Sequence, residues 1–441
     1  MTSEVDHESI IEIDSSAFSG AVSRNHRHPL SRIRYQLLGM VLFAVALPAL
    51  LRYLQLPNFL NEAGTLISMG MVIPGVILTY FLWRRLHAYP DTNPVNVAAW
   101  AVGVIFLVLI FYIVFSRIEY NRTLVFTAPI LSFAWLLVIS YVMRRDRPLR
   151  VGVLPAANLA SLPKSSSIQW IELTEPPSPH MFDGYVANLR HDYCKSWEHF
   201  VVQSTLEGVP VYHTKQIIEQ ITGRVTVDHL SENNFGSVLP NLNYLVAKRV
   251  LDLCAVAVAV VPLAVVAIIV AILIRLREGG PIIFRQKRIG RRGKLFTVYK
   301  FRTMRVPTQP ISNDVESAKT KRNDPRITPL GKILRKFRLD EIPQLLNIVR
   351  GEMSWIGPRP EAAVLGRSYE EKFPYYRYRY AVRPGITGWA QVCQGHVTND
   401  DDVRVKLEYD FYYVKNVSFW LDTTITIKTI QTILAGRLFR R

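Results

Sequence analysis

Four long apolar stretches in the first third of the chain constrain its fold more than any other feature. They cover residues 37–56, 64–83, 97–115 and 124–143. Each has about 20 residues, which as a helix rising about 1.5 Å per residue crosses the hydrocarbon core of a bilayer. Buried helices of a water-soluble protein are the alternative, but four such runs so close together favour a membrane α-helical bundle of four spans.

Basic residues beside these stretches indicate how the bundle is oriented. Arginines cluster before the first stretch, after the second and after the fourth, at residues 24–34, 84–85 and 144–150. The loop at 57–62 has no Lys or Arg, and the loop after the third stretch has only Arg117 and Arg122. The positive-inside rule therefore places both ends of the bundle in the cytoplasm.

The interior of the four stretches argues against transport. None carries Asp, Glu or Lys at its centre. A transporter usually needs such a residue, so the bundle is expected to be an anchor or a partner surface. Its helical surface is free for self-association, which allows a homodimer.

Changes in composition divide the chain into four parts. Residues 1–32 are polar and lack the apolar run of a signal peptide, so we expect a disordered cytoplasmic tail ahead of the transmembrane region at 33–145. Residues 146–245 alternate strand-like and helix-like segments, which predicts a small cytoplasmic α/β domain with a parallel sheet. That part has no GxGxxG or P-loop to support nucleotide binding. Residues 246–441 form the last part.

A fifth apolar run, at about 250–275, is also long enough to span the bilayer. A crossing helix is the simplest expectation, but Lys248 and Arg249 precede the run, and Arg275 and Arg277 follow it. Basic residues at both ends oppose placing either end outside. Pro262, near the middle, removes a helical hydrogen bond and permits a kink. We therefore expect a Pro-kinked re-entrant helix that keeps the following residues on the cytoplasmic face.

The segment after this run is strongly basic. Between Arg275 and Arg305 it has eleven Lys or Arg and one acid, in a chain whose 53 basic and 35 acidic residues give a net charge of +18. Binding of anionic membrane lipid accounts for most of these charges, and no nucleic-acid-binding motif is present. The segments IIFRQKR and KLFTVYKFRTM predict two strands around a turn. Lys300 and Arg302 would then share a face suited to a diphosphate.

Two adjacent carboxylates, Asp340 and Glu341, lie in the passage RKFRLDEIPQLLNIVRGEM. Apolar residues recur there at helical spacing, and Pro343 is tolerated only in a first turn, so the pair is expected at or beside a helix N-terminus. Asp340 could merely cap that helix. Alternatively, one carboxylate could attack phosphorus while the other holds a divalent cation.

From about residue 248 to 436, the chain resembles the catalytic domain of the monotopic polyprenyl-phosphate phosphoglycosyl transferases, the bacterial sugar transferase family. The matching segments are KRVLDL with its Pro-bearing apolar run, GGPIIFRQKRIG, KLFTVYKFRTM, DPRITPLGKILRKFRLDEIPQLLNIVRGEMSWIGPRPE, VRPGITGWAQV and LEYDFYYVKNVSFWLDT. The preceding parts resemble the long branch that initiates exopolysaccharide, capsule or O-antigen repeat units. The implied fold class is a four-span helical bundle, a small α/β domain, and an α+β monotopic phosphoglycosyl transferase domain at 246–441.

The resemblance implies an undecaprenyl-phosphate hexose-1-phosphate transferase at the bacterial inner membrane. It would move a sugar 1-phosphate from a UDP-sugar, expected to be UDP-glucose or UDP-galactose, to undecaprenyl phosphate and release UMP. Asp340 would be the nucleophile that forms a covalent aspartyl phosphosugar, and Glu341 would bind Mg²⁺. The implied substrate-binding residues are Lys300, Arg302, Arg335 and Arg359 for phosphates, Glu352 as support, and Arg383 close to the nucleotide.

Two other functions stay open. A non-catalytic scaffold of a glycan-assembly complex would use the basic domain to bind anionic lipid and proteins. A processive glycosyltransferase would release UDP instead of UMP. Nucleotide product analysis therefore separates both from the expected enzyme.

Two further clusters invite a functional interpretation. Asp400, Asp401 and Asp402 resemble a metal motif, but three acids after Thr and Asn favour a turn and helix start. The second cluster interleaves tyrosines with arginines over residues 375–380. Base stacking is one alternative for it, and anchoring at the membrane interface is favoured because Tyr is enriched there.

Overall fold

The computed structural model describes residues 32–56, 63–90, 92–145, 148–164, 168–226, 240–305, 324–373, 375–395 and 400–434. The chain divides into two compact units, Met1–Gly223 and Arg224–Arg441. The predicted disordered tail lies outside the described residues, apart from Arg32.

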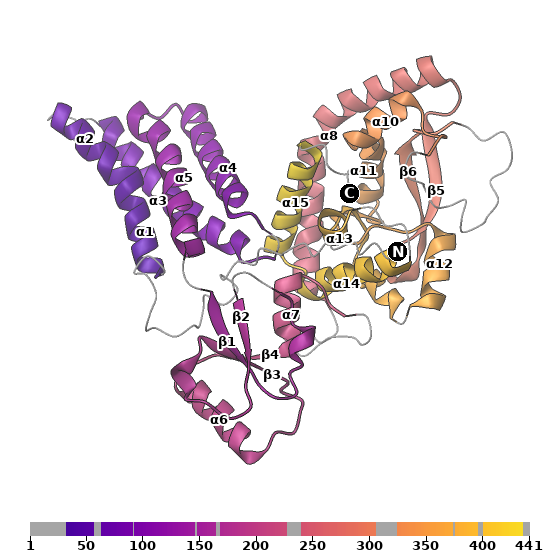
Figure 1. Ribbon diagram of the computed structural model, residues 1–441. Helices are drawn as coiled ribbons and strands as arrows, with labels where there is room; N and C mark the ends of the chain where they lie inside the picture. Colours follow the sequence, from indigo (N-terminus) through magenta and orange to yellow (C-terminus); the bar gives the residue numbers. More distant parts are fainter. Residues whose placement is uncertain are drawn as a thin grey trace, which may run out of the picture. The chain divides into compact units, whose positions relative to one another are not determined.

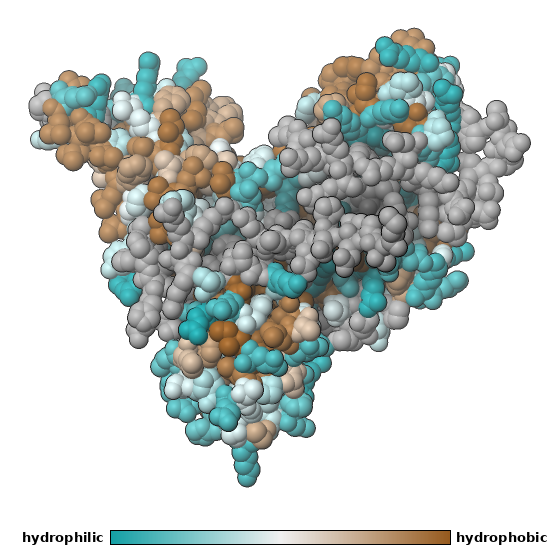
Figure 2. Space-filling model, viewed as in Figure 1, coloured by the Kyte–Doolittle hydropathy of each residue, from teal (hydrophilic) through white to brown (hydrophobic). Residues whose placement is uncertain are grey.

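The first unit begins with helices that match the four apolar stretches (Figure 1). They are α1 (Ile33–Val41) continued by the π-helical turn η3 (Leu42–Ala46) and α2 (Leu47–Gln55), then α3 (Ala63–His87), α4 (Pro94–Phe115) and α5 (Arg122–Arg145). Each stretch is long and apolar enough to cross a membrane. In the most apolar part of each stretch, no more than 39% of the residues are buried inside the protein. Figure 2 shows apolar residues gathered over these helices. The expectation of several apolar membrane helices is confirmed, and their crossing stays a prediction.

Three residues inside the bundle, from three different helices, are joined by hydrogen bonds through their polar groups. The Tyr80 hydroxyl donates to Gln36 Oε1 at 2.7 Å, and Trp135 Nε1 donates to the Gln36 carbonyl at 2.9 Å. Gly39 lies against Trp135, where an added Cβ would come within 2.2 Å of the ring. Because unsatisfied polar groups are costly in hydrocarbon, these contacts hold α1 beside α3 and α5.

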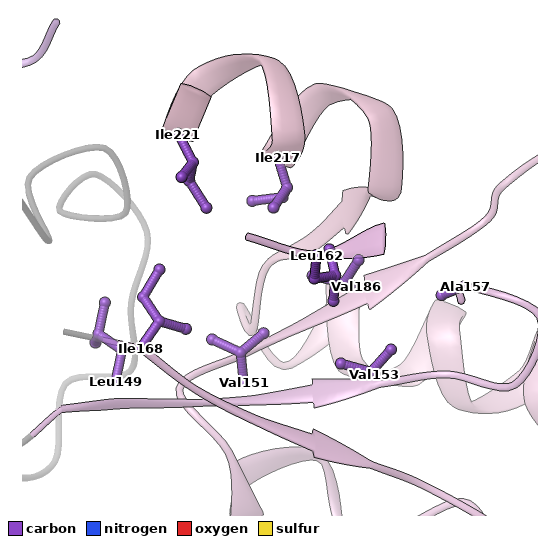
Figure 3. Packing of buried hydrophobic residues seen from close by; sticks show 9 residues of the cluster. All are labelled: Leu149, Val151, Val153, Ala157, Leu162, Ile168, Val186, Ile217 and Ile221. Atoms are coloured by element: carbon purple, nitrogen blue, oxygen red, sulfur yellow. The ribbon is translucent and has the colours of Figure 1, made fainter. Parts of the chain in front are cut away.

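A four-stranded parallel sheet completes the first unit, as predicted. Its strands β1 (Leu149–Val153), β2 (Ile168–Glu172), β3 (Gly184–Ala187) and β4 (Val211–His213) lie in the order β2-β1-β3-β4. Helix α6 (Lys195–Leu206) packs on one face and α7 (Thr214–Thr222) on the other. Figure 3 shows Ile217 and Ile221 of α7 pointing toward Val151 and Ile168. Successive residues of β3 point to opposite faces of the sheet. Val186 belongs to the hydrophobic core under α7, and Tyr185 belongs to the core under α6.

The second unit is largely helical and contains a β-hairpin. Its first elements are α8 (Leu242–Glu278), β5 (Ile283–Ile289), the turn η7 (Arg291–Gly293), β6 (Leu295–Phe301), α10 (Pro329–Lys336), the 3-10 helix η8 (Leu339–Gln344) and α11 (Leu345–Val349). The later elements are β7 (Ser354–Ile356), α12 (Ala363–Lys372), η9 (Tyr376–Ala381), β8 (Gly385–Thr387), α13 (Trp389–Cys393), α14 (Asp400–Asn416) and α15 (Phe419–Leu434). The antiparallel hairpin β5–β6 confirms the two predicted strands, although β6 ends at Phe301.

Helix α8 contains Pro262 and is drawn in Figure 1 as two limbs set at an angle. Before the proline, Val256 joins a core with Val298 and Ile348. After it, Val270 and Ile274 join a core with Phe301 and Leu334. Both limbs therefore pack on the same compact unit. A proline is the common cause of a sharp helix kink, so we attribute the bend to Pro262.

The carboxylate pair lies in a 3-10 helix, and the regular α-helix begins only at Leu345. Pro343 has no N–H to donate, which accounts for the delayed start. The residue before η8 is Arg338, and its side chain makes no capping bond. Asp340 is therefore not the N-cap, and the capping interpretation is wrong.

The tyrosine cluster is largely internal, so the interfacial interpretation is wrong for most of it. Tyr376 and Tyr380 are 3% and 6% exposed, and Arg379 between them is buried. Arg379 donates to Asp410 of α14 at 2.7 Å, and this pairing explains how a guanidinium is buried there. Of the four tyrosines in residues 375–380, Tyr375 alone has a large exposed surface.

The three acids at 400–402 form the first turn of α14, which confirms the helix-start interpretation. Asp400 pairs with Lys372 at 2.7 Å on the surface.

Candidate active site

Asp340 and Glu341 are buried where η8 packs against the hairpin. Their residues are 7% and 3% exposed. Lys300 of β6 donates from Nζ to Glu341 Oε1 at 2.9 Å, a contact across 41 positions of sequence. Asn347 of α11 fixes the same junction, since its amide donates to the Thr297 carbonyl and accepts from the Tyr299 N–H.

Three cations converge on the Glu341 carboxylate. Lys300 Nζ lies 2.9 Å from Oε1, Arg359 Nη2 lies 2.7 Å from Oε1, and Arg338 Nη1 lies 3.3 Å from both oxygens. Burial by itself would raise the pKa of Glu341, but the charges of Arg359, Lys300 and Arg338 hold that pKa well below its usual value. Glu341 is therefore ionised across the physiological range.

Asp340 experiences the opposite balance. Burial and the neighbouring charge of Glu341 raise the pKa of Asp340, although Lys300, Arg335 and Arg359 oppose this. Its Oδ1 atom is buried and has no hydrogen-bond partner in the described part of the chain. A carboxylate oxygen without a partner, close to several cations, is suited to react with an anionic phosphate group.

Burial also shifts the titration of Lys300. Desolvation lowers the pKa of its ammonium to about 8, even though the charge of Glu341 acts to raise it. Lys300 therefore loses its charge within a moderately alkaline range.

Arg359 is positioned through its own loop. Its carbonyl accepts from Arg379 Nη2 at 2.8 Å, and the next carbonyl, of Pro360, accepts from Arg288 Nη1. Arg379 is paired with Asp410, and both side chains are 2% exposed. The buried Arg379 and the partly buried Arg288 thus hold the GPRP segment, residues 357–360, while the Arg359 guanidinium reaches Glu341.

Arg335 of α10 is the fourth cation near the carboxylates. Its Nε donates to Thr303 Oγ1 at 2.9 Å. Burial lowers the pKa of Arg335, and the charge of Asp340 partly offsets that lowering. Lys300, Arg335, Arg338 and Arg359 together exceed the charge of the two carboxylates. The site can therefore accept a polyanion such as a diphosphate.

Residues 243–436 match the family described as bacterial sugar transferase. Over 401 residues, the chain is 37% identical to a protein of Aeromonas hydrophila named UDP-N-acetylgalactosamine-undecaprenyl-phosphate N-acetylgalactosaminephosphotransferase. That alignment covers 90% of this chain and 94% of the relative. The chain belongs to the bacterial sugar transferase family.

Two further relatives of this transferase match a smaller share of the chain. One is the Exopolysaccharide production protein PSS of Rhizobium leguminosarum bv. phaseoli, 42% identical over 195 residues, which are 43% of this chain and 96% of that protein. The other is the UDP-glucose:undecaprenyl-phosphate glucose-1-phosphate transferase of Escherichia coli strain K12, 36% identical over 185 residues, which are 42% of this chain and 39% of that protein.

The structure of this sugar transferase brings three of the expected substrate-binding residues around Asp340 and Glu341 and places three others apart. Lys300, Arg335 and Arg359 surround the pair. Arg302 binds the carbonyls of Glu278 and Gly279 at the end of α8 and does not share the contacts of Lys300. The guanidinium of Arg302 and the ammonium of Lys300 therefore contact different elements, and their joint binding of a diphosphate stays a prediction.

Glu352 and Arg383 also make contacts away from the carboxylate pair. Glu352 accepts from Asn347 Nδ2 at 2.6 Å, so it supports the junction of α11 with the hairpin. Arg383 donates from Nε to the Gly351 carbonyl at 3.0 Å. Burial and the charges of Arg291 and Arg249 lower the pKa of Arg383. The expected proximity of Arg383 to the nucleotide stays a prediction.

Arg338 is the site residue that the sequence analysis missed. It precedes Glu341 by three positions, and residues three apart lie on one face of a helix. That spacing would have identified the pair, but the helix was expected to start after Arg338.

The carboxylates fit the ligand preferences of Mg²⁺. This ion takes oxygen ligands, often one or two carboxylates completed by water and substrate phosphates. Asp340 Oδ1 has no hydrogen-bond partner, whereas both oxygens of Glu341 are occupied by cations. Glu341 could therefore bind a metal ion only if Arg338, Arg359 or Lys300 left its carboxylate and paired with another anion. Among the described residues, no cluster of three or more His, Cys, Asp or Glu could hold a metal ion.

Proposed function

We propose that this sugar transferase moves a sugar 1-phosphate from a UDP-sugar to undecaprenyl phosphate, releases UMP and so initiates assembly of a lipid-linked glycan. The observation that carries the proposal is the Asp340 carboxylate, buried beside four cations with one oxygen unpartnered. The names of the Aeromonas and Escherichia relatives describe the same class of reaction.

In the first step, an oxygen of ionised Asp340 attacks the phosphorus that carries the sugar. A bond from that oxygen to phosphorus forms, the bond between this phosphorus and the bridging oxygen breaks, and UMP leaves with the bridging oxygen. The product is a phosphosugar held on Asp340 as an acyl phosphate. Lys300, Arg335 and Arg359 neutralise charge on the phosphate oxygens, which is the main contribution that a protein makes to phosphoryl transfer.

In the second step, an oxygen of undecaprenyl phosphate attacks the same phosphorus. The bond to Asp340 breaks, the carboxylate is regenerated, and the lipid diphosphate sugar leaves. Because UMP departs before the lipid reacts, we expect ping-pong kinetics.

Glu341 is the residue that we propose as a Mg²⁺ ligand. The ion would supply further neutralisation of the phosphate oxygens.

UDP-N-acetylgalactosamine joins UDP-glucose and UDP-galactose as a donor to test. The relative that matches nearly the whole chain is named for N-acetylgalactosamine, and the glucose-named relatives match about half of the chain or less. This finding shifts the preference away from the two hexoses expected from the sequence.

The proposed location is the cytoplasmic membrane, with four crossing helices and the catalytic unit at the cytoplasmic face. Support for a re-entrant α8 comes from its bend and from the packing of both its limbs on one unit. Lys248 before the proline is paired with Asp422 of α15, and Arg275 after it donates to the Gly280 carbonyl. A helix returning to the same side would place Asp340 near the lipid phosphate.

Nucleotide product analysis tests this function. Purified protein with Mg²⁺ and each UDP-sugar, with and without undecaprenyl phosphate, is expected to release UMP with one donor. Asp340→Asn should abolish the release, because the amide cannot attack phosphorus. UDP as product would indicate a processive glycosyltransferase, and no turnover with any donor would favour the scaffold function.

A further inference from the structure

Arg338 makes the longest contacts with Glu341 among the three cations. Its Nη1 lies 3.3 Å from each carboxylate oxygen, compared with 2.9 Å for Lys300 and 2.7 Å for Arg359. A guanidinium carries five N–H donors. Within the described residues, Nη1 supplies the side-chain hydrogen bonds of Arg338, so most of these donors remain free for a ligand.

The backbone of Arg338 adopts an unusual conformation. Its φ of 57° and ψ of 20° lie in the left-handed region, which residues other than Gly seldom adopt. Its carbonyl accepts from the Glu341 N–H at 3.2 Å, which closes the turn over the carboxylate. Strained residues of this kind concentrate at binding and catalytic sites.

The side chain of Arg338 connects the buried carboxylate to solvent. It is 21% exposed, whereas the Glu341 side chain is 4% exposed. Lys300 and Arg359 already exceed the single charge of Glu341 and approach it more closely. A third cation is therefore not needed to neutralise Glu341, which leaves the partly exposed guanidinium of Arg338 available to an incoming anion.

We propose that Arg338 is a substrate-binding residue that exchanges its contact with Glu341 for a phosphoryl group. The proposal rests on the proposed function. Guanidinium and phosphate form paired hydrogen bonds from two nitrogens, which are stronger than the two long contacts that Nη1 alone makes with Glu341. The phosphoryl group belongs either to the UDP-sugar or to undecaprenyl phosphate, and the two half-reactions separate these sources.

A purely structural role predicts a different kinetic effect. If Arg338 only oriented Glu341, its loss would lower kcat and leave the KM values of both substrates unchanged. If Arg338 binds phosphate, its loss raises the KM of the substrate that it contacts. The division between KM and kcat therefore decides between the two roles.

The test compares Arg338→Asn with Arg338→Lys and Lys336→Asn in the full-length protein. Asn tolerates the left-handed backbone and removes the charge, and Arg338→Gly replaces it if the Asn variant does not fold. Lys restores the charge without the planar fork. Lys336, two residues earlier, is exposed, and its loss changes the net charge by the same amount. KM and kcat are measured for the UDP-sugar and for undecaprenyl phosphate, and the affinity for UMP is measured by calorimetry.

For Arg338→Asn we expect about a tenfold or larger rise in the KM of one phosphate substrate, because a charged hydrogen bond is lost. We expect partial recovery in Arg338→Lys and no change in Lys336→Asn. A rise in the KM of the UDP-sugar with weaker UMP binding identifies the donor, and a rise in the KM of the lipid identifies the acceptor. Unchanged KM values for both substrates in a folded Arg338→Asn protein would overturn the proposal, whereas a wild-type protein that releases no UMP would remove the proposed function itself.

Discussion

Two adjacent carboxylates acquire opposite properties from the charges that face them. The Glu341 carboxylate contacts Lys300, Arg338 and Arg359 directly, and these charges lower its pKa despite its burial. Asp340 is buried beside the charge of Glu341, and its pKa rises. The proposed division of labour, with Asp340 as nucleophile and Glu341 as the permanent anion of the site, agrees with these two directions.

The lowered pKa of Lys300 predicts an alkaline limit to activity. Lys300 is charged below its pKa of about 8 and neutral above it, so phosphate binding should weaken as the pH rises through that value. Lys300→Arg keeps a positive charge, because a guanidinium stays protonated at any such pH. We expect the alkaline limb of kcat/KM to move to higher pH in Lys300→Arg, even if the rate at neutral pH is lower. An alkaline limb at the same pH in both proteins would contradict the role of Lys300.

At the scale of elements, the GPRP segment depends on a buried ion pair. Arg379 holds the Arg359 carbonyl and is itself paired with Asp410. Asp410→Asn should lower the free energy of unfolding by about 3 kcal/mol, because it removes the closer of the two carboxylates that face the buried Arg379 guanidinium and leaves Glu361, 3.7 Å away. Asp400→Asn, which disrupts the exposed pair with Lys372, should cost about 1 kcal/mol or less. Thermal unfolding in detergent compares the two variants, and equal losses would contradict the role of the buried pair.

The bend of α8 makes a prediction about topology. The three native cysteines are first replaced by Ser. Leu242→Cys and Leu276→Cys are then introduced separately, because both positions are exposed and lie near opposite ends of α8. If α8 is re-entrant, a membrane-impermeant maleimide labels both in inverted vesicles and neither in intact spheroplasts.

Arg117→Cys serves as the control for that experiment, because the loop after α4 is expected on the outer face and should react in spheroplasts. Labelling of Leu242→Cys and Leu276→Cys from opposite sides would show a fifth crossing helix.

Local patterns predicted the elements better than they predicted their contacts. Apolar length identified the candidate membrane helices, and alternation identified the hairpin and the parallel sheet. The burial of Tyr376 was missed because it depends on Arg379 and Asp410, which lie 31 positions apart in sequence. The contact of Arg302 with the end of α8 was missed for a similar reason, because Arg302 and Glu278 lie 24 positions apart in sequence.

At the scale of the whole molecule, the two units give the protein distinct surfaces. The first combines apolar helices with a small α/β domain, and the second holds the candidate site and the match to the family. The similarity to the Aeromonas hydrophila relative covers 90% of this chain and therefore extends over both units. Homodimer formation and binding of anionic lipid stay predictions from the apolar helices and the net charge of +18.

The central claim is that Asp340 carries the sugar phosphate between the two substrates. The most direct measurement is intact-protein and peptide mass spectrometry after incubation with the UDP-sugar that supports turnover, without lipid. The account predicts one added phosphosugar on the peptide that contains Asp340, absent in Asp340→Asn and lost when undecaprenyl phosphate is added. Lipid-dependent UMP release with no covalent adduct at any time before lipid addition would contradict it and indicate direct transfer between the substrates.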